Sequence, residues 1–161
     1  MRSFLTIYIV LLFIWSCSSI KSNSGKGTDF TADELNISAM EERAFSGRSA
    51  ESDTVVIGDH ETAYEIIIID PGYYSWLHSI AMPEGYYSQQ FMESRNRVYV
   101  NNWNQRVANP LVYDPSLYEM RINYDPSIDY GYQVNYKLYN YFLYFQRKYR
   151  QRLGPFFPRI R

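Results

Sequence analysis

The chain has 161 residues, a formal net charge of −1 and a single cysteine. One cysteine cannot form a disulfide within the chain, so the composition excludes a disulfide-stapled scaffold and leaves core packing to stabilise the fold. Without its first residues the chain is about 145 residues long, which suits one domain.

The N-terminus has the features of an export signal. Arg2 precedes a mostly apolar run from Phe4 to Trp15. A helix needs about 20 apolar residues to cross a bilayer, and this run has about 12. Residues 1–16 are therefore predicted to be a signal peptide and not a transmembrane helix.

Cys17 follows this run directly. Ile14, Ser16 and Cys17 resemble the lipobox of bacterial lipoproteins, in which the cysteine becomes the lipidated N-terminus. The alternative is an incidental cysteine in an ordinary signal peptide. Two or three acyl chains would hold the protein at a membrane, whereas one chain would not.

Residues 17–53 are predicted to form a flexible tether. They contain mainly Ser, Gly, Lys, Glu and Asp, and such a composition buries too little apolar surface to offset the entropy of ordering. Within this segment, Thr31 and Glu34 have the spacing of a capping box, which indicates a short helix over about 32–45.

The folded domain is predicted to cover residues 54–153, with a basic C-terminal tail over 154–161. Residues 54–58 (TVVIG) and 64–70 (YEIIIID) suit strands, because β-branched residues dominate them. Asp70 and Pro71 are expected to end the second strand and to begin a short helix, with the Asp70 carboxylate as its cap. A third strand is expected over residues 117–124 (LYEMRINY).

Residues 86–107 are predicted to form an amphipathic helix that ends at Asn109-Pro110. Arg95, Asn102 and Arg106 lie on one line of this helix, inside the arc expected to face the core. Two arginines beside aromatic rings could bind a carboxylate or phosphate as a ligand. The alternative is a structural ion-pair network, because an unpaired buried arginine is costly. Its expected carboxylate partners are Asp70, Asp114, Asp125 or Asp129.

Two near-copies, YDPSL at residues 113–117 and YDPSI at residues 124–128, are expected to form turns. The alternative is a calcium site built from Asp114, Glu119, Asp125 and Asp129, but their spacing fits no EF-hand loop. No metal site is predicted.

Residues 129–149 (DYGYQVNYKLYNYFLYFQRKY) raise the question of whether their tyrosines form a core or a platform that binds a glycan. On a helical wheel the apolar residues cover about 220°, which is typical of a mostly enclosed helix. The rings are therefore predicted to be core. The polar face is predicted to carry Gln133, Lys137, Asn140, Tyr144 and Arg147.

The chain shows no catalytic signature. His60 and His78 do not form a metal-ligand pattern with acids, and there is no nucleophile elbow or nucleotide-binding loop. No cofactor is predicted. Seven basic and no acidic residues follow Asp129. An exported protein is not expected to meet nucleic acid. This end is therefore interpreted as a solvated helix end, or as a contact for anionic lipid or polymer or for the protein's own acidic segment.

Three stretches, IIIIDPGYYSWL, YYSQQFMESRNRVYVNNWNQRV and NYDPSIDYGYQVNYKLYNYF, resemble an uncharacterised family of small lipoproteins from the Bacteroidota. The resemblance covers about residues 64–153. It implies a bacterial envelope lipoprotein and brings no site residue besides Cys17. Surface export in those bacteria is associated with acidic residues soon after the cysteine, and residues 18–23 contain none. This favours an outer-membrane anchor that faces the periplasm.

The sequence thus predicts an α+β domain in which about three helices pack a small sheet of two or three strands around an aromatic-rich core. The predicted function is that of a non-catalytic envelope lipoprotein, anchored in the membrane by its lipid, that binds another envelope component. The alternatives are a glycan or peptidoglycan-binding module and a hydrolase, since a carboxylate pair can form without a sequence motif.

Overall fold

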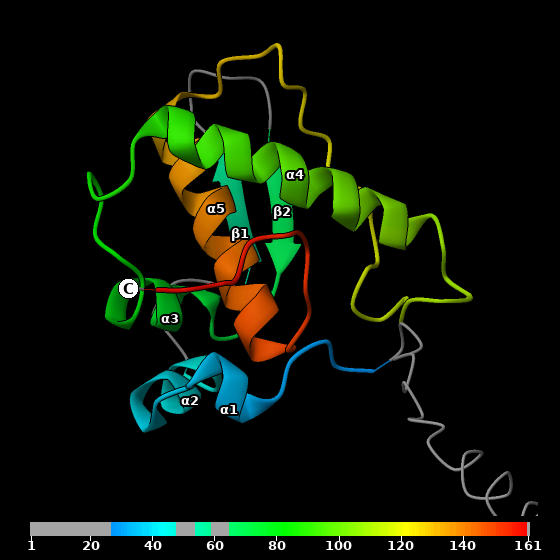
Figure 1. The fold of residues 1–161 in the computed structure, drawn as a ribbon. Helices are drawn as coiled ribbons and strands as arrows, with labels where there is room; N and C mark the ends of the chain where they lie inside the picture. Colours follow the sequence, from blue (N-terminus) through cyan, green and yellow to red (C-terminus); the bar gives the residue numbers. More distant parts are fainter. Residues whose placement is uncertain (1–26, 48–53, 59–64, 161) are drawn as a thin grey trace, which may run out of the picture.

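The computed structural model describes residues 27–47, 54–58 and 65–160. Figure 1 shows how the elements are arranged. In chain order they are α1 (Ala32–Leu35), α2 (Ala39–Phe45), β1 (Thr54–Gly58), β2 (Glu65–Ile69), α3 (Tyr73–Ser79), α4 (Gln89–Val107) and α5 (Gly131–Lys148).

The core forms where α5 packs against α4 and α3 (Figure 1). Its centre is aromatic: the ring centroids of Trp103 and Phe145 lie 4.8 Å apart, and those of Tyr73 and Tyr144 lie 5.5 Å apart. The prediction of an aromatic-rich core is confirmed. The largest fully buried side chains include Trp76, Tyr73, Tyr99, Tyr144, Phe142, Phe145, Met92 and Leu138.

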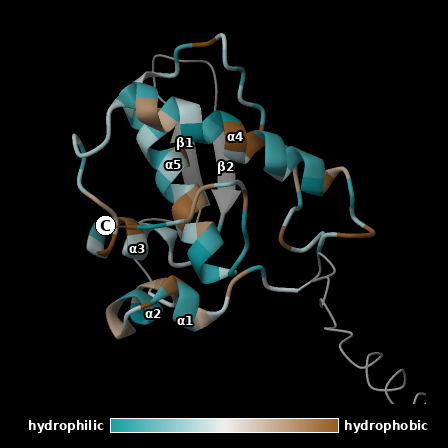
Figure 2. Cartoon of the chain, in the orientation of Figure 1, coloured by the Kyte–Doolittle hydropathy of each residue, from teal (hydrophilic) through white to brown (hydrophobic). Residues whose placement is uncertain are grey.

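Helix α4 begins three residues later than predicted, after Ser88, and ends at Val107 as predicted. The Ser88 hydroxyl accepts a hydrogen bond from the Phe91 amide at 3.2 Å, which caps the first turn of α4. Asn109-Pro110 follows the end of α4, as expected. Figure 2 shows hydrophilic residues predominating on the side of α4 turned to the viewer, and Arg97 and Asn101 are among its exposed residues.

The predicted α+β fold is wrong. Strands β1 and β2 occupy two segments expected to be extended, and they pair as an antiparallel ribbon with Thr54 opposite Ile69. However, the described part of the domain is helical, and its core is built by helices and their connections, not by a sheet that helices cover. Helix α5 explains why a sheet does not form the core. Its buried rings point to nearly all sides, so helices and loops have to surround it.

The third expected strand is an irregular segment that runs along α4. The Asn104 side chain takes the place of a neighbouring strand, because its amide donates to the Ile122 carbonyl and accepts from the Ile122 amide, both at 2.9 Å. The Trp103 indole donates to the Met120 carbonyl at 2.9 Å. Side chains of a helix thus satisfy backbone groups that a sheet would otherwise pair.

Both Asp-Pro-Ser segments form the predicted turns. The Asp114 carboxylate accepts from the amide of Ser116 at 2.9 Å and from its hydroxyl at 2.8 Å, and Asp125 accepts from Ser127 at the same two distances. These contacts are the side-chain hydrogen bonds that make Asp favourable at such turns.

The prediction of a tether over residues 17–53 is wrong for residues 27–47. Thr31 and Glu34 form the predicted capping box, but the expected single helix is divided into α1 and α2, because Asn36 ends α1 in the left-handed region. The amides of Asp29 and Phe30 donate to the Arg150 carbonyl at 2.7 and 3.1 Å, and Phe30 is buried. The segment is therefore part of the domain. Cys17 and the predicted signal peptide lie outside the described residues.

None of the helices in the described part of the chain has the length and apolarity needed to cross a membrane.

Candidate functional site

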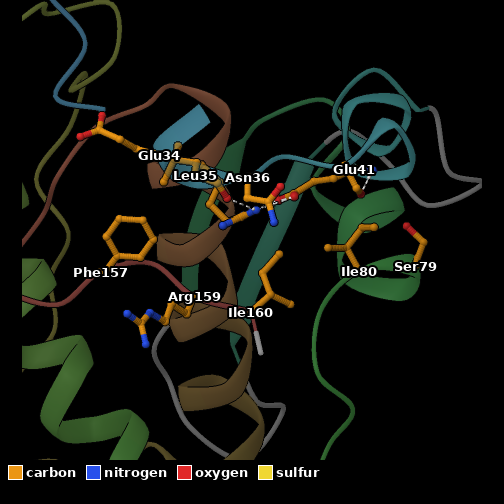
Figure 3. A pocket seen from close by; sticks show the side chains of 11 residues that line it. Glu34, Leu35, Asn36, Glu41, Ser79, Ile80, Phe157, Arg159 and Ile160 are labelled. Atoms are coloured by element: carbon orange, nitrogen blue, oxygen red, sulfur yellow. Dashed lines mark hydrogen bonds and ion pairs between the residues drawn. The ribbon is translucent and has the colours of Figure 1, made fainter. Parts of the chain in front are cut away.

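A pocket of about 320 Å³ opens where the N-terminal helices meet the C-terminal residues and the end of α3 (Figure 3). In sequence, the N-terminal helices and the C-terminal residues are more than a hundred residues apart. The residues that line it are Glu34, Leu35, Asn36, Ser38, Glu41, Ser79, Ile80, Arg147, Phe157, Arg159 and Ile160.

The floor of the pocket is a buried ion pair between α2 and α5. Two nitrogens of the Arg147 guanidinium donate to the two oxygens of Glu41, at 2.5 and 2.6 Å. The side chains are only 6% and 2% exposed, so water screens the pair little. The bidentate geometry is the one in which arginine binds a carboxylate most strongly.

Further hydrogen bonds surround this pair. Arg147 also donates to the carbonyls of Pro158 at 3.0 Å and Leu35 at 3.1 Å, and the Trp76 indole donates to Glu41 at 3.1 Å. Each charged group is therefore held by two or more partners. This arrangement joins α1, α2, α3, α5 and the C-terminal residues, and it leaves neither group placed as a free acid or base.

The rim of the pocket is open and mixed in character. Phe157 is 41% exposed, and its ring meets the buried Phe30 ring edge-on at 5.4 Å. The exposed Arg159 guanidinium lies 5.7 Å from the Phe157 ring centroid. Figure 3 shows Ile160 on the same side as Arg159, with Ile80 and Ser79 across the opening. The rim thus offers apolar contacts and a cation.

The line of Arg95, Asn102 and Arg106 on α4 does not form one site. The Arg95 guanidinium packs between two rings, 3.3 Å from the Phe156 centroid and 5.0 Å from that of Phe91. The Asn102 side chain donates to the Val98 carbonyl of its own helix at 2.9 Å. These two residues contribute to packing on α4.

Arg106 is held in a structural network. Its guanidinium donates to Tyr118 at 2.6 Å and to Gln151 at 3.1 Å, and it donates to the Arg152 carbonyl. Its carboxylate partner is Asp29, at 3.4 Å. The predicted carboxylate partners of this arginine, in the second strand and the Asp-Pro-Ser turns, are therefore wrong. The carboxylate comes from the segment predicted to be a tether, which is why spacing within the domain could not indicate it.

A second polar cluster surrounds Asp70, which is 5% exposed. The Asp70 carboxylate does not cap α3, whose N-cap is Gly72 without a side-chain hydrogen bond. Instead it accepts from Tyr144 at 3.0 Å, from Lys148 at 2.9 Å and from Tyr149 at 3.1 Å. The expected cap is wrong, because groups brought by α5 reach the carboxylate.

Burial and the nearby charge of Asp70 raise the pKa of the Tyr144 and Tyr149 hydroxyls above the usual range. These tyrosines stay protonated and act as hydrogen-bond donors. Sequence reasoning missed this cluster, because Asp70 and Lys148 are 78 residues apart in the chain.

Within the described residues, no three His, Cys, Asp or Glu side chains are grouped so that they could hold a metal ion. His78 lies on the exposed side of α3, with its ring 6.2 Å from that of Tyr74, and His60 lies outside the described residues.

Comparison with known proteins identifies the family. The model of a family of unknown function, DUF6146, matches residues 4–156. The chain belongs to this family. No curated protein and no solved structure matches the chain. Membership of this family indicates an uncharacterised domain and brings no known activity. The function therefore has to be argued from the pocket and its surroundings.

Proposed function

We propose that this member of the DUF6146 family is a non-catalytic lipoprotein of the bacterial cell envelope that binds another envelope component at its pocket. The anchor is lipid on Cys17, and the domain faces the periplasm from the outer membrane. The short apolar run before Cys17 supports export and lipidation. The resemblance to lipoproteins of the Bacteroidota supports the envelope location.

The observation that carries the binding role is the contrast between the floor and the rim of the pocket. The floor is rigid, because Glu41 and Arg147 bind each other and neighbouring groups from several elements. The rim exposes Phe157 and Arg159 without a comparable network. A pocket with a rigid floor and an apolar, cationic rim is suited to binding a ligand.

The same floor argues against acid–base or nucleophilic chemistry. A general base has to reach the proton it removes, and a nucleophile has to be presented to substrate. The Glu41 oxygens are occupied by Arg147 and Trp76. A hydrolase is therefore the weakest of the three candidates.

The rim favours a protein segment as the ligand. An apolar side chain of the partner would pack between Phe157 and Ile80, and a carboxylate would pair with Arg159. Aromatic and arginine side chains are the types that contribute most to binding energy at such contacts.

The test is site-specific crosslinking in cells. A photoreactive amino acid at Phe157 should give one discrete protein adduct. The same group at Tyr86, which is exposed and not among the residues that line the pocket, should not give it. Arg159→Glu should reduce the Phe157 adduct at least several-fold by reversing the charge at the rim. The same adduct from both positions, or no effect of Arg159→Glu, would contradict the proposal.

Lipidation is tested separately. Cys17→Ala should abolish acyl labelling and release the protein from the membrane fraction, because lipid is the proposed anchor. Equal acyl labelling of the variant and the native chain would refute the anchor.

Glycan binding is the second candidate, and one observation favours it. The exposed Phe157 ring shares the pocket with the Asn36 amide and the Ser38 hydroxyl, and a ring beside hydrogen-bonding groups can hold a sugar face. Most other rings are buried, so the structure offers no extended aromatic platform among the described residues. Calorimetric titration with soluble peptidoglycan fragments should show heat that Phe157→Ala removes if this candidate is right.

A further inference from the structure

The last turn of α4 leads into an exposed apolar tip. Leu111 is 91% exposed and Val112 is 45% exposed, whereas most large apolar side chains of the described domain are covered. The turn is ordered, because the amides of Val112 and Tyr113 both donate to the Asn109 carbonyl at 3.0 Å. The structure thus presents two aliphatic side chains on a fixed support.

A series of contacts links the start of the described chain to Tyr113, in the loop that follows α4. The Gly27 carbonyl accepts from Gln151 at 3.0 Å, and Gln151 in turn accepts from Arg106 at 3.1 Å. The Arg106 guanidinium lies 4.8 Å from the ring centroid of Tyr113, two residues after Leu111. Figure 1 shows the start of the described chain near the loop that follows α4.

The distance from this point to the proposed anchor is short. Cys17 and Gly27 are ten residues apart. Ten residues span at most about 35 Å when fully extended, and a flexible coil of that length has a root-mean-square span of about 17 Å. The ordered segment from Gly27 onward therefore holds the domain close to the bilayer, with the Gly27 side toward it.

The charge near Gly27 is compatible with a lipid surface. Arg150 and Arg152 flank Gln151, and Arg152 is exposed. Aliphatic side chains next to basic residues are the combination by which peripheral segments bind the interface of anionic membranes.

We infer that the tip formed by Leu111 and Val112 contacts the bilayer that holds the acylated N-terminus, and that this contact sets the orientation of the domain. The inference rests on the proposed lipid anchor. The pocket lies at the other end of the N-terminal segment, beyond α1, so this orientation leaves it accessible to a partner.

The test uses the full acylated chain, in which lipid occupies Cys17. Leu111→Cys labelled with an environment-sensitive fluorophore is reconstituted into phosphatidylethanolamine and phosphatidylglycerol vesicles that contain a nitroxide-labelled lipid. Tyr86→Cys is the matched control, since Tyr86 is 56% exposed and precedes the opposite end of α4. The 19 residues of α4 separate the two ends by about 28 Å.

The fluorophore at position 111 should be quenched several-fold more than that at position 86. Equal quenching in vesicles that carry the protein would overturn the inference and leave the lipid anchor intact. Failure of the native chain to acquire acyl label and to float with vesicles would overturn both. Stronger quenching at position 86 would show the reverse orientation and would also overturn the inference.

Discussion

Tyr144 lies in the C-terminal half of α5 and connects the core to a buried carboxylate. Its ring contacts those of Phe45, Tyr73 and Trp76, with centroids 5.7, 5.5 and 5.8 Å away. Its hydroxyl is 2.7 Å from the Pro71 carbonyl and 3.0 Å from Asp70, and it accepts from Lys148. The prediction that Tyr144 lies on a solvated polar face is therefore wrong, and this side chain has both a packing and a polar role.

Tyr144→Ala should reduce the free energy of unfolding by about 3–5 kcal/mol, because it leaves a cavity among rings. Tyr144→Phe should cost about 1–3 kcal/mol, because it keeps the ring and removes one of the three hydrogen bonds that the buried Asp70 carboxylate accepts. Urea denaturation measures both values. Tyr86→Ala, at an exposed ring, should change stability by no more than about 0.5 kcal/mol. Equal losses at positions 86 and 144 would refute the enclosed position of Tyr144.

The buried pair of Glu41 and Arg147 allows a double-mutant cycle. Glu41→Gln and Arg147→Met should each cost about 3–5 kcal/mol, because each leaves its partner buried without an opposite charge. The double variant should cost less than the sum of the two, with a coupling of about 0.5–3 kcal/mol. Arg159→Met, an exposed arginine of the same pocket, is the control and should have little effect. Strict additivity would mean that the two charges do not interact.

At the scale of elements, α2 and α3 are joined by a close backbone contact. Gly72 has a φ of 93°, and a Cβ atom at this position would lie 2.2 Å from the Phe45 carbonyl oxygen. A side chain is therefore excluded both by the left-handed conformation and by the end of α2. The absence of a side chain at Gly72 therefore allows α2 to pack closely on the turn before α3.

Gly72→Ala should destabilise the protein by more than its conformational strain alone. Gly85 supplies the control, because it has a φ of 85° but nothing lies within 4 Å of its Cβ position. Gly85→Ala should cost about 1–2 kcal/mol, which is the usual penalty of a left-handed alanine. Thermal unfolding of both variants measures the difference. A smaller loss at Gly72 than at Gly85 would show that α2 does not pack on this turn.

At the scale of the whole molecule, the core contains many protonated phenols. Burial raises the pKa of Tyr118 to about 12, although the Arg106 guanidinium beside it opposes the shift. Burial, with a smaller contribution from the negative charge of Glu93, raises the pKa of Tyr124 to about 12. An unfolded tyrosine has a pKa of about 10. The folded state therefore favours the neutral hydroxyls.

The pH dependence of stability follows from this difference. These tyrosines contribute their full stabilisation below pH of about 10, and the contribution is lost as the pH rises from about 10 to about 12. Urea midpoints should therefore fall through this range, and the absorbance of phenolate should rise together with unfolding. Tyr118→Phe and Tyr124→Phe should make the fall less steep. Ionisation of all tyrosines near pH 10 in a protein that stays folded would contradict the buried positions.

Local chemistry made part of this structure predictable. Asn109-Pro110 marks the end of α4, Thr31 and Glu34 form a capping box, and both Asp-Pro-Ser turns depend on contacts between residues two apart. The aromatic core was also predictable, because apolar rings on so many sides of one helix must be enclosed. The pocket was not predictable, since it joins the N-terminal helices to the last residues of the chain.

The sequence by itself determined where α4 ends, that the Asp-Pro-Ser segments turn and that the rings of α5 are buried, because these depend on neighbouring residues and on apolar area. Only the tertiary structure decided which polar side chains of α5 are buried. Arg147 and Tyr144 are covered because α2 and the turn before α3 bring Glu41 and Asp70 to them, from 106 and 74 residues away. A periodic pattern records which residues are polar, but only the folded chain supplies the partners that make burying them favourable.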